Sequence, residues 1–176
     1  MAIETIQVTI KGESPLLMNR FPLEPIEAMA KKKPAEQAEI SAYRDEATGN
    51  LYIPGVALQR CLVAGAAYSK GKGRATLQKP VAACVLVSPE KINLGVSVYQ
   101  IDSRAVVIAA TKGRIIRHRA RLDEWSVTFA IEYDPDLITE SELRRVVDDS
   151  GKRVGLLDFR PERKGMYGRF MVIAWN

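Results

Sequence analysis

The sequence lacks the features that mark a membrane or secreted protein. No stretch of its 176 residues approaches the roughly 18 consecutive apolar residues of a membrane-spanning helix. The opening MAIETIQVTIKGES has no basic segment followed by an apolar one, so we expect no signal peptide. Cys61 and Cys84 lie in apolar surroundings without C-x-x-C spacing, which favours buried free thiols. These absences predict a cytoplasmic protein.

Residues that carry catalysis or bind metals are also scarce. The chain has one histidine, His118, and GKGRAT is not a Walker motif because GxxxxGK[ST] is absent. The acids of residues 132–149 are typical of a solvated helix start. We therefore predict no enzyme activity, no cofactor and no metal. A metal-independent ribonuclease that uses His118 stays open as a minor alternative.

Acidic residues are almost missing from the middle of the chain. Residues 47–122 contain 12 lysines and arginines but only two acids, Glu90 and Asp102. Residues 123–149 are the reverse, with nine acids and two bases. A neutral solvated surface normally intersperses its signs. Such segregation implies a polyanion, a membrane or an acidic protein surface as the partner of the positive part.

Hydrophobic periodicity predicts the order of the elements. Alternation predicts strands at residues 3–10 and 124–134, and apolar runs predict strands at 81–88 and 169–175. Helical spacing predicts a helix in VALQRCLVAGAAY, and a capping box of Thr139 and Glu142 opens a second helix, ESELRRVVDDSG. The order is typical of one α+β domain over residues 1–176, ferredoxin-like or RRM-like (βαββαβ), with four antiparallel strands backed by two helices.

Two insertions interrupt this order. Residues 13–50 contain four prolines, and we expect an irregular, partly mobile segment with a short helix around AEQAEISAY. Residues 90–122 contain two extended segments flanking Lys112-Gly113, which predict a basic hairpin that turns at this pair.

The hairpin strand RIIRHRARL (114–122) is the sharpest local feature. Arg117, Arg119 and Arg121 alternate with other residues, so the pattern predicts three guanidiniums on one face of a ribbon. Adjacent like charges cost free energy in a purely structural hairpin. An aggregation-resistant edge strand would explain them in part, but guanidiniums also match phosphate oxygens, which favours a nucleic-acid contact.

Two glycine-containing loops extend the basic surface. In YSKGKGRATLQKP, glycines would let the backbone approach a phosphodiester, and the C-terminal LLDFRPERKGMYGRF combines arginines with Phe159 and Tyr167 as possible stacking platforms. Both would form one continuous cationic track with the hairpin. The predicted nucleic-acid contacts are Lys70, Lys72, Arg74, Lys112, Arg114, Arg117, Arg119, Arg121, Arg160, Arg163, Lys164, Tyr167 and Arg169.

Two stretches resemble signatures of the RAMP superfamily, the RRM-like proteins of CRISPR effector complexes. YIPGVALQRCLVAGAAY resembles the motif IPGSSLKGALR, although VALQR replaces its serine pair, and VGLLDFRPERKGMYGRFMV resembles the glycine-rich loop before the last strand. The positions that carry the resemblance are Ile53, Pro54, Gly55, Leu58 and Arg60, and then Gly155, Gly165 and Gly168.

Within that superfamily the backbone subunits fit best, and the resemblance implies several properties. Such subunits carry a hairpin thumb, here residues 101–122, and polymerise head to tail along guide RNA. Processing endonucleases have two such folds and a catalytic histidine, which this chain does not match. Target-cleaving subunits use an aspartate in the first insertion, where turn chemistry explains Asp45, so we assign it no catalytic role. The compact form also suggests a stand-alone relative encoded by a phage or prophage.

The leading hypothesis is therefore a non-catalytic, largely sequence-independent binder of single-stranded RNA or, less favoured, DNA. It would assemble head to tail into a homo-oligomer, either a filament or a ring, because opposite charges on one subunit can meet between neighbours. The alternative is a protein-interaction module that mimics or inhibits a CRISPR effector subunit.

Overall fold

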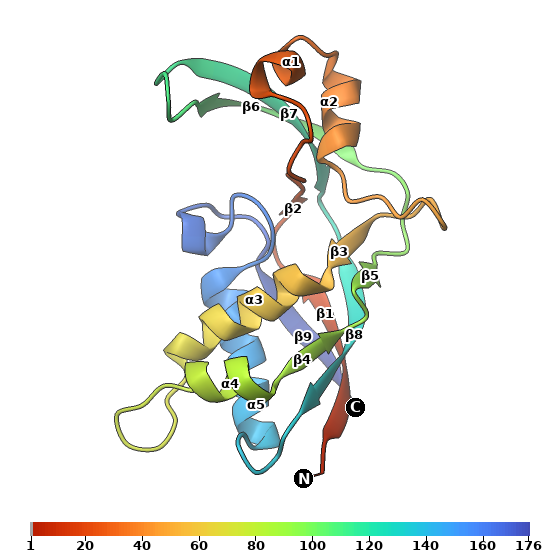
Figure 1. Ribbon diagram of the computed structural model, residues 1–176. Coiled ribbons are helices and arrows are strands. Elements are labelled where there is room, and N and C mark those ends of the chain that lie inside the picture. Colours follow the sequence, from red (N-terminus) through yellow and green to blue (C-terminus); the bar gives the residue numbers. More distant parts are fainter. Residues whose placement is uncertain (1) are drawn as a thin grey trace.

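The computed structural model describes residues 2–176, which fold into two lobes (Figure 1). One lobe holds a four-stranded sheet with helices on one face, and the other holds a hairpin with two short helices. The strands are β1 (Glu4–Gly12), β2 (Leu16–Leu17), β3 (Tyr52–Pro54), β4 (Leu86–Ser88), β5 (Lys91–Asn93), β6 (Gln100–Val107), β7 (Arg114–Leu122), β8 (Ser126–Tyr133) and β9 (Phe170–Trp175). The helices are α1 (Ile26–Ala30), α2 (Pro34–Ser41), α3 (Gly55–Gly65), α4 (Gln78–Cys84) and α5 (Glu140–Asp149), with shorter helical turns η1 (Ala66–Tyr68), η2 (Ser150–Val154) and η3 (Pro161–Arg163).

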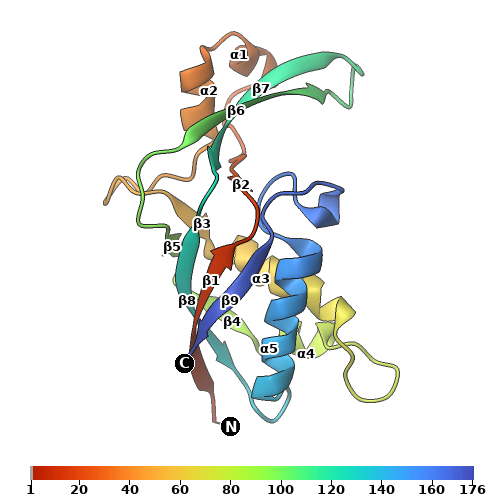
Figure 2. The same ribbon diagram turned by 180° about the vertical axis from the view of Figure 1, so that it is seen from behind.

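The main sheet has the ferredoxin-like arrangement, as predicted. Its core elements follow one another along the chain as β1, α3, β4, β8, α5 and β9, and the strands lie side by side in the order β4-β8-β1-β9. Every neighbouring pair is antiparallel. The view from behind shows β1 between β8 and the edge strand β9, with β9 next to α5 (Figure 2).

One face of this sheet is buried beneath the helices. Ile6, Val8 and Ile10 of β1 point to that face, and α3 and α5 cover it with side chains that include Leu58 and Leu143. The first residue of α3 is a glycine for a steric reason, since a Cβ on Gly55 would lie 2.6 Å from the carbonyl oxygen of Pro89. Among the described residues, no helix has the length and apolar character needed to cross a bilayer.

The strand predicted at residues 81–88 is wrong over its first half. Helix α4 continues to Cys84, and only Leu86–Ser88 pair with β8. Pro80 sits in the first turn of α4, where the missing N–H group costs little, and the alanines that follow favour a helix. An apolar run of this length does not by itself distinguish a strand from a short helix.

The insertion at residues 13–50 is folded and not irregular, which corrects the expectation drawn from its prolines. It contributes β2, which pairs with β7, and the helices α1 and α2, which pack on the hairpin. The amide oxygen of Gln37 and the hydroxyl oxygen of Ser41, both on α2, accept hydrogen bonds from the backbone N–H groups of His118 and Ala120. Helix α2 therefore closes part of the edge of β7.

The hairpin itself lies where the sequence predicts it, but its turn is longer. Strands β6 and β7 pair from Gln100–Arg121 to Val107–Arg114, and residues 108–113 connect them. The N–H group of Ile108 donates to Gly113 at 2.9 Å, and that of Lys112 donates to Ile108 at 2.7 Å. Lys112 has a φ of +53°, so this lysine, and not a glycine, occupies the left-handed region.

Candidate nucleic-acid interface

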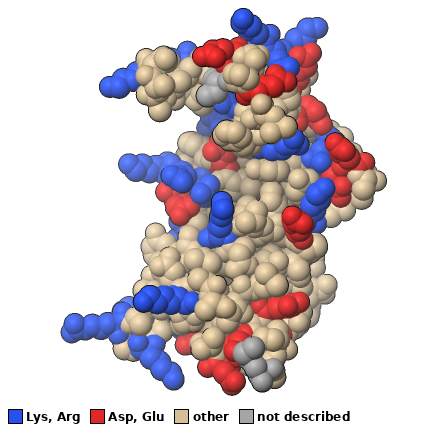
Figure 3. Space-filling model, viewed as in Figure 1, with Lys and Arg blue, Asp and Glu red and all other residues tan. Residues whose placement is uncertain are grey.

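The predicted contacts do not form one continuous track. Those of the hairpin and of the glycine-rich loop lie side by side, joined by the ion pair of Arg119 and Asp158, whereas those of the loop between η1 and α4 lie apart from both. Basic side chains gather over the hairpin lobe, around α3 and η3, and at the loop between η1 and α4 (Figure 3). Largely uncharged surface separates the loop between η1 and α4 from the other two places on the face in view. The sequence places all three clusters in acid-poor or arginine-rich segments, but the distances between them depend on the tertiary fold.

The hairpin arginines, predicted as three guanidiniums on one face of a ribbon, are not all free to bind a ligand. Arg119 is 6% exposed and forms an ion pair with Asp158 of the glycine-rich loop. Arg121 forms ion pairs with Asp102 at 3.2 Å and with Asp123 at 2.8 Å. Arg117 donates to the side-chain oxygen of Asn19 at 3.2 Å. Lys112 and Arg114, at the tip, are exposed and have no ion-pair partner among residues 2–176.

Asp102 is the buried centre of this arrangement. It is 4% exposed and lies opposite Arg119 in the β6–β7 ladder, and it also accepts two hydrogen bonds from Arg104 at 2.7 and 2.9 Å. Burial alone would raise the pKa of Asp102, but the hydrogen bonds and charges of the arginines outweigh it and lower that pKa below its ordinary value. The Asp102 carboxylate therefore stays charged and keeps the arginines in place. Burial is also the main cause that lowers the pKa of Arg119.

The aromatic rings of the glycine-rich loop are half-buried and contact an arginine of the hairpin. Arg104 lies 4.6 Å from the ring centroid of Phe159 and 5.1 Å from that of Tyr167, and it donates to the Tyr167 hydroxyl at 3.1 Å. The two rings meet edge to face at 5.3 Å. Arg104 therefore occupies one face of each ring, and the interpretation of Phe159 and Tyr167 as stacking platforms stays a prediction.

The glycine-rich loop, residues 155–169, is held by its own backbone. Leu156 donates to Gly168 at 2.9 Å, and Tyr167 donates to Phe159 at 2.8 Å. Gly168 has a φ of +75°, and a Cβ there would lie 2.0 Å from the carbonyl oxygen of Leu156. Leu157 and Phe159 also adopt positive φ angles, an arrangement that persists only where surrounding contacts impose it. The loop thus presents its side chains in fixed positions.

Among the predicted contacts of this loop, one is neutralised. Arg160 forms an ion pair with Glu162 at 2.9 Å. Arg163, Lys164 and Arg169 are exposed, and within residues 2–176 none has an ion-pair partner. The free cations of the loop are therefore Arg163, Lys164 and Arg169.

The loop between η1 and α4 lies at the end of the molecule farthest from the hairpin (Figure 1). Lys70, Lys72 and Arg74 are exposed there without an ion-pair partner in the described part of the chain. Gly71 donates to Ala75 at 2.9 Å, so the loop folds back on itself. Its separation from the other two clusters means that one short strand cannot contact all three on a single subunit.

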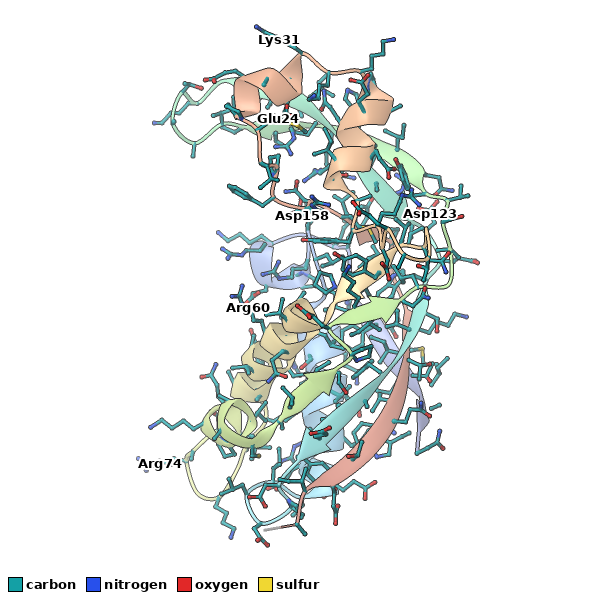
Figure 4. The ribbon with its side chains drawn as sticks, turned by 45° about the vertical axis from the view of Figure 1, so that its right-hand side comes forward. Glu24, Lys31, Arg60, Arg74, Asp123 and Asp158 are labelled. Carbon is teal, nitrogen blue, oxygen red and sulfur yellow. The ribbon has the colours of Figure 1, made fainter. Side chains whose placement is uncertain are left out.

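A hollow of about 400 Å³ lies between the two lobes, and its lining comes from three parts of the chain. Asn19 and Tyr43 come from the first insertion, Arg60 from α3, and Arg163 from η3. Arg60 is exposed, and neither Arg60 nor Arg163 has an ion-pair partner within residues 2–176. Figure 4 shows Arg60 on α3 below Asp158, which lies where the loop meets the hairpin lobe. This hollow is the inter-lobe cleft.

The sequence analysis missed Asn19, Tyr43 and Arg60 as candidate contacts. Arg60 had a signal, because it lies within the stretch that resembles the RAMP signature, but no basic neighbour marked it. Asn19 and Tyr43 had none, because only the fold of the insertion brings them to the cleft.

His118 lies on the opposite face of β7 from Arg117 and Arg119, because side chains alternate along a strand. Its Nδ1 atom is 2.7 Å from the hydroxyl oxygen of Ser103. In the part of the chain that the structure describes, no group of three His, Cys, Asp or Glu side chains has an arrangement that could hold a metal ion.

Comparison with known proteins places the fold. No protein-family model and no curated protein matches the sequence. Two of the solved structures that match cover nearly the whole chain. One, a cryo-EM structure of the type III-B Cmr-beta complex bound to cognate target RNA, contains a chain with 11% identity and a TM-score of 0.58 over 99% of this chain. The other, Cmr6 from Pyrococcus furiosus, has 10% identity and a TM-score of 0.51 over 98% of this chain. This chain spans 60% of the length of the matched Cmr-beta chain and 100% of Cmr6.

Proposed function

The chain has the fold of RAMP-type CRISPR subunits, and on that premise we propose that it is a non-catalytic subunit that binds single-stranded nucleic acid, RNA in preference to DNA. The inter-lobe cleft is the observation that carries this proposal. It is hollow, and its lining includes Arg60 and Arg163, which have no ion-pair partner within residues 2–176. The two acids of the lining, Asp158 and Glu162, are paired with Arg119 and Arg160, and the pair of Arg119 and Asp158 joins the two walls. A polyanion would supply the negative charge that these two arginines lack.

Binding in this cleft would depend mainly on phosphates. Guanidiniums donate to phosphate oxygens irrespective of the base, and Arg104 already occupies one face of the rings of Phe159 and Tyr167. We therefore expect little sequence preference and a steep dependence of affinity on salt. The preference for RNA rests on the Cmr-beta complex, which is the neighbour bound to target RNA.

Self-assembly head to tail belongs to the same proposal. The cationic loop at Lys70, Lys72 and Arg74 lies too far from the cleft to share one short ligand with it on the same subunit. In a row of subunits, the loop of one copy and the cleft of another would contact successive parts of one strand. Affinity for long RNA would then come from many weak contacts.

The experiment is a salt titration of binding to single-stranded RNA. Arg60→Glu and Arg163→Glu should each weaken binding strongly and flatten the plot of log affinity against log salt by about 0.7 per lost phosphate contact. Lys11→Glu is the charge-matched control, because Lys11 is exposed on β1 and does not line the cleft. Equal loss in all three variants, or a plot that is flat for the wild type, would contradict the proposal.

A further inference from the structure

The inter-lobe cleft has an acid in its wall, although we propose that a polyanion binds there. Asp158 lines the cleft, and its side chain is 32% exposed. Its Oδ2 atom accepts a hydrogen bond from the buried Arg119, which balances the charge of the carboxylate. The other oxygen, Oδ1, accepts no hydrogen bond from residues 2–176. The cleft therefore contains an acceptor that a phosphate cannot satisfy, because an ionised phosphate is itself an acceptor.

The hydroxyl of Tyr43 lies in the same cleft. Tyr43 is half-buried, and its backbone N–H group donates to the sulfur of Met18 at 3.4 Å. Burial raises the pKa of its hydroxyl, and Asp158 is close enough for its charge to add to the rise. The hydroxyl therefore stays protonated at neutral pH. In the described part of the chain it has no hydrogen-bond partner, so it can donate to a ligand.

An acceptor and a donor in one cleft suit a hydroxyl group of the ligand. A hydroxyl donates one hydrogen bond, which Asp158 can accept, and its oxygen accepts others, which Tyr43 can donate. Ribose has such a group at its 2′ position in every nucleotide, and deoxyribose lacks it. A carboxylate is also the group that binds the ribose 2′-hydroxyl in dinucleotide-binding folds. The N–H groups of the bases are the other donors of a nucleic acid, but their positions differ from base to base.

We infer that Asp158 and Tyr43 bind the ribose 2′-hydroxyl and thereby give the cleft its preference for RNA over DNA. Arg60 and Arg163 contribute affinity without this preference, because phosphates are the same in both nucleic acids. Asp158 and Arg60 line one hollow, with Asp158 above Arg60 in Figure 4, so the ribose attached to a phosphate at Arg60 lies within the hollow as well. The inference rests on the proposed function and assigns the residues that select its ligand.

The test compares three single-stranded uridine hexamers by fluorescence anisotropy at low salt. Their sugars are ribose, 2′-deoxyribose and 2′-fluororibose, while bases and phosphates are the same, so differences in affinity report on the sugar alone. The wild type should bind the ribose hexamer about tenfold more tightly than the deoxyribose hexamer, as expected for a hydrogen bond to a charged group. The 2′-fluoro hexamer should bind as weakly as the deoxyribose hexamer. Fluorine keeps the sugar in an RNA-like conformation but cannot donate to Asp158.

Tyr43→Phe removes one hydroxyl and leaves the ring in place. It should lower the affinity for the ribose hexamer about fivefold, the effect of one lost hydrogen bond, and so reduce the ratio of ribose to deoxyribose affinity. Tyr52→Phe is the matched control, because the ring of Tyr52 packs against that of Tyr43 but Tyr52 does not line the cleft. This control should keep the wild-type ratio.

Asp158→Asn reverses the hydrogen bonding at the second position. Arg119 can only donate, so the oxygen of the new amide faces Arg119 and its NH₂ group faces the cleft. The acceptor is replaced by a donor, and the affinity ratio should fall to about one. The ratio cancels the effect of the lost negative charge, which is common to both hexamers. Glu162→Gln changes the other acid of the lining and should keep the ratio. Circular dichroism verifies that each variant is folded.

The outcomes separate this inference from the proposed function. Equal affinity of the wild type for ribose and deoxyribose hexamers would overturn the inference and leave the binding of nucleic acid standing. Tight binding of the 2′-fluoro hexamer would show that the cleft senses sugar conformation, and a ratio unchanged in both Tyr43→Phe and Asp158→Asn would assign the preference to other groups. Either result would overturn the inference. A wild type that binds none of the hexamers would overturn the proposed function, and the inference with it.

Discussion

Arg119 on the hairpin and Asp158 on the glycine-rich loop form an ion pair that joins the two lobes. The Arg119 side chain is 7% exposed and that of Asp158 is 32% exposed. Two of the three segments from which nucleic-acid contacts were predicted are therefore bound to each other, and this pair helps to set the width of the inter-lobe cleft. A site fixed in this way loses little conformational freedom when a ligand binds.

Asp158→Asn should destabilise the protein, because it leaves the buried Arg119 without a full countercharge. Removing one partner of a buried pair costs about 3–5 kcal/mol, and the partial exposure of Asp158 brings our expectation down to about 2 kcal/mol. Urea unfolding measures the difference. Glu162→Gln, which removes the exposed partner of Arg160, should cost less than about 1 kcal/mol. Equal losses would show that the lobes do not depend on the pair.

Acid should weaken the contact between hairpin and loop through Asp102. Its pKa lies below the ordinary value of 3.8 in the folded protein. A lowered folded-state pKa stabilises the fold above the unfolded-state value, and this stability is lost as the pH falls through the folded-state pKa. The wild type should therefore lose part of its free energy of unfolding below about pH 4.

Asp102→Asn should be less stable at pH 7 and should show a shallower loss below that pH. Asp136→Asn, in an exposed loop, is the control and should keep the wild-type profile. A profile of Asp102→Asn parallel to that of the wild type would refute the role of this carboxylate.

The hairpin arginines should separate into one that binds RNA and one that supports the fold. Arg117→Glu should lower RNA affinity several-fold and reduce the salt slope by about 0.7, while its free energy of unfolding changes by less than about 0.5 kcal/mol. Arg119→Glu should instead lose more than about 2 kcal/mol of stability, because its carboxylate would face Asp102 and Asp158. Anisotropy at several salt concentrations and urea unfolding provide both quantities, and a reversed pattern would refute the assignment.

The glycine-rich loop should not tolerate a side chain at Gly168. Gly168→Ala combines an unfavourable φ of +75° with a Cβ 2.0 Å from a carbonyl oxygen, whereas Gly73 has a φ of +66° and nothing within 4 Å. Gly73→Ala should therefore cost about 1 kcal/mol for its backbone conformation alone. Gly168→Ala should cost clearly more in thermal or urea unfolding and should also weaken RNA binding. Equal costs would mean that the loop yields easily.

Much of the fold could be predicted because local pattern and burial agree. Alternation in β1 and β8 and the capping box at Thr139 are local signals that the tertiary structure keeps. The strand prediction failed at residues 81–84 because a short apolar run fits either a strand or a buried helix. The helical content of the first insertion was underestimated because its prolines were read as signs of irregular chain. Proline also occurs at helix starts, which is where Pro25 and Pro34 lie.

The candidate site could be predicted only in part, because pairing of charges is a tertiary property. Asp102 lies two residues from Arg104 in the sequence, yet its contact with Arg121 depends on hairpin register. Asp158 lies 39 residues from Arg119. Residue counts identified where positive charge is concentrated, but only the fold determines which guanidiniums remain for a ligand.

The cover that α2 gives to β7 protects the hairpin against unwanted strand addition. Long basic hairpins expose backbone groups that can template pairing with other chains. Gln37 and Ser41 occupy two donors of β7 with side-chain oxygens. A foreign strand could therefore extend this small sheet readily only at β6. Truncating the side chains of Gln37 and Ser41 would expose the edge of β7 as a second place for strand addition.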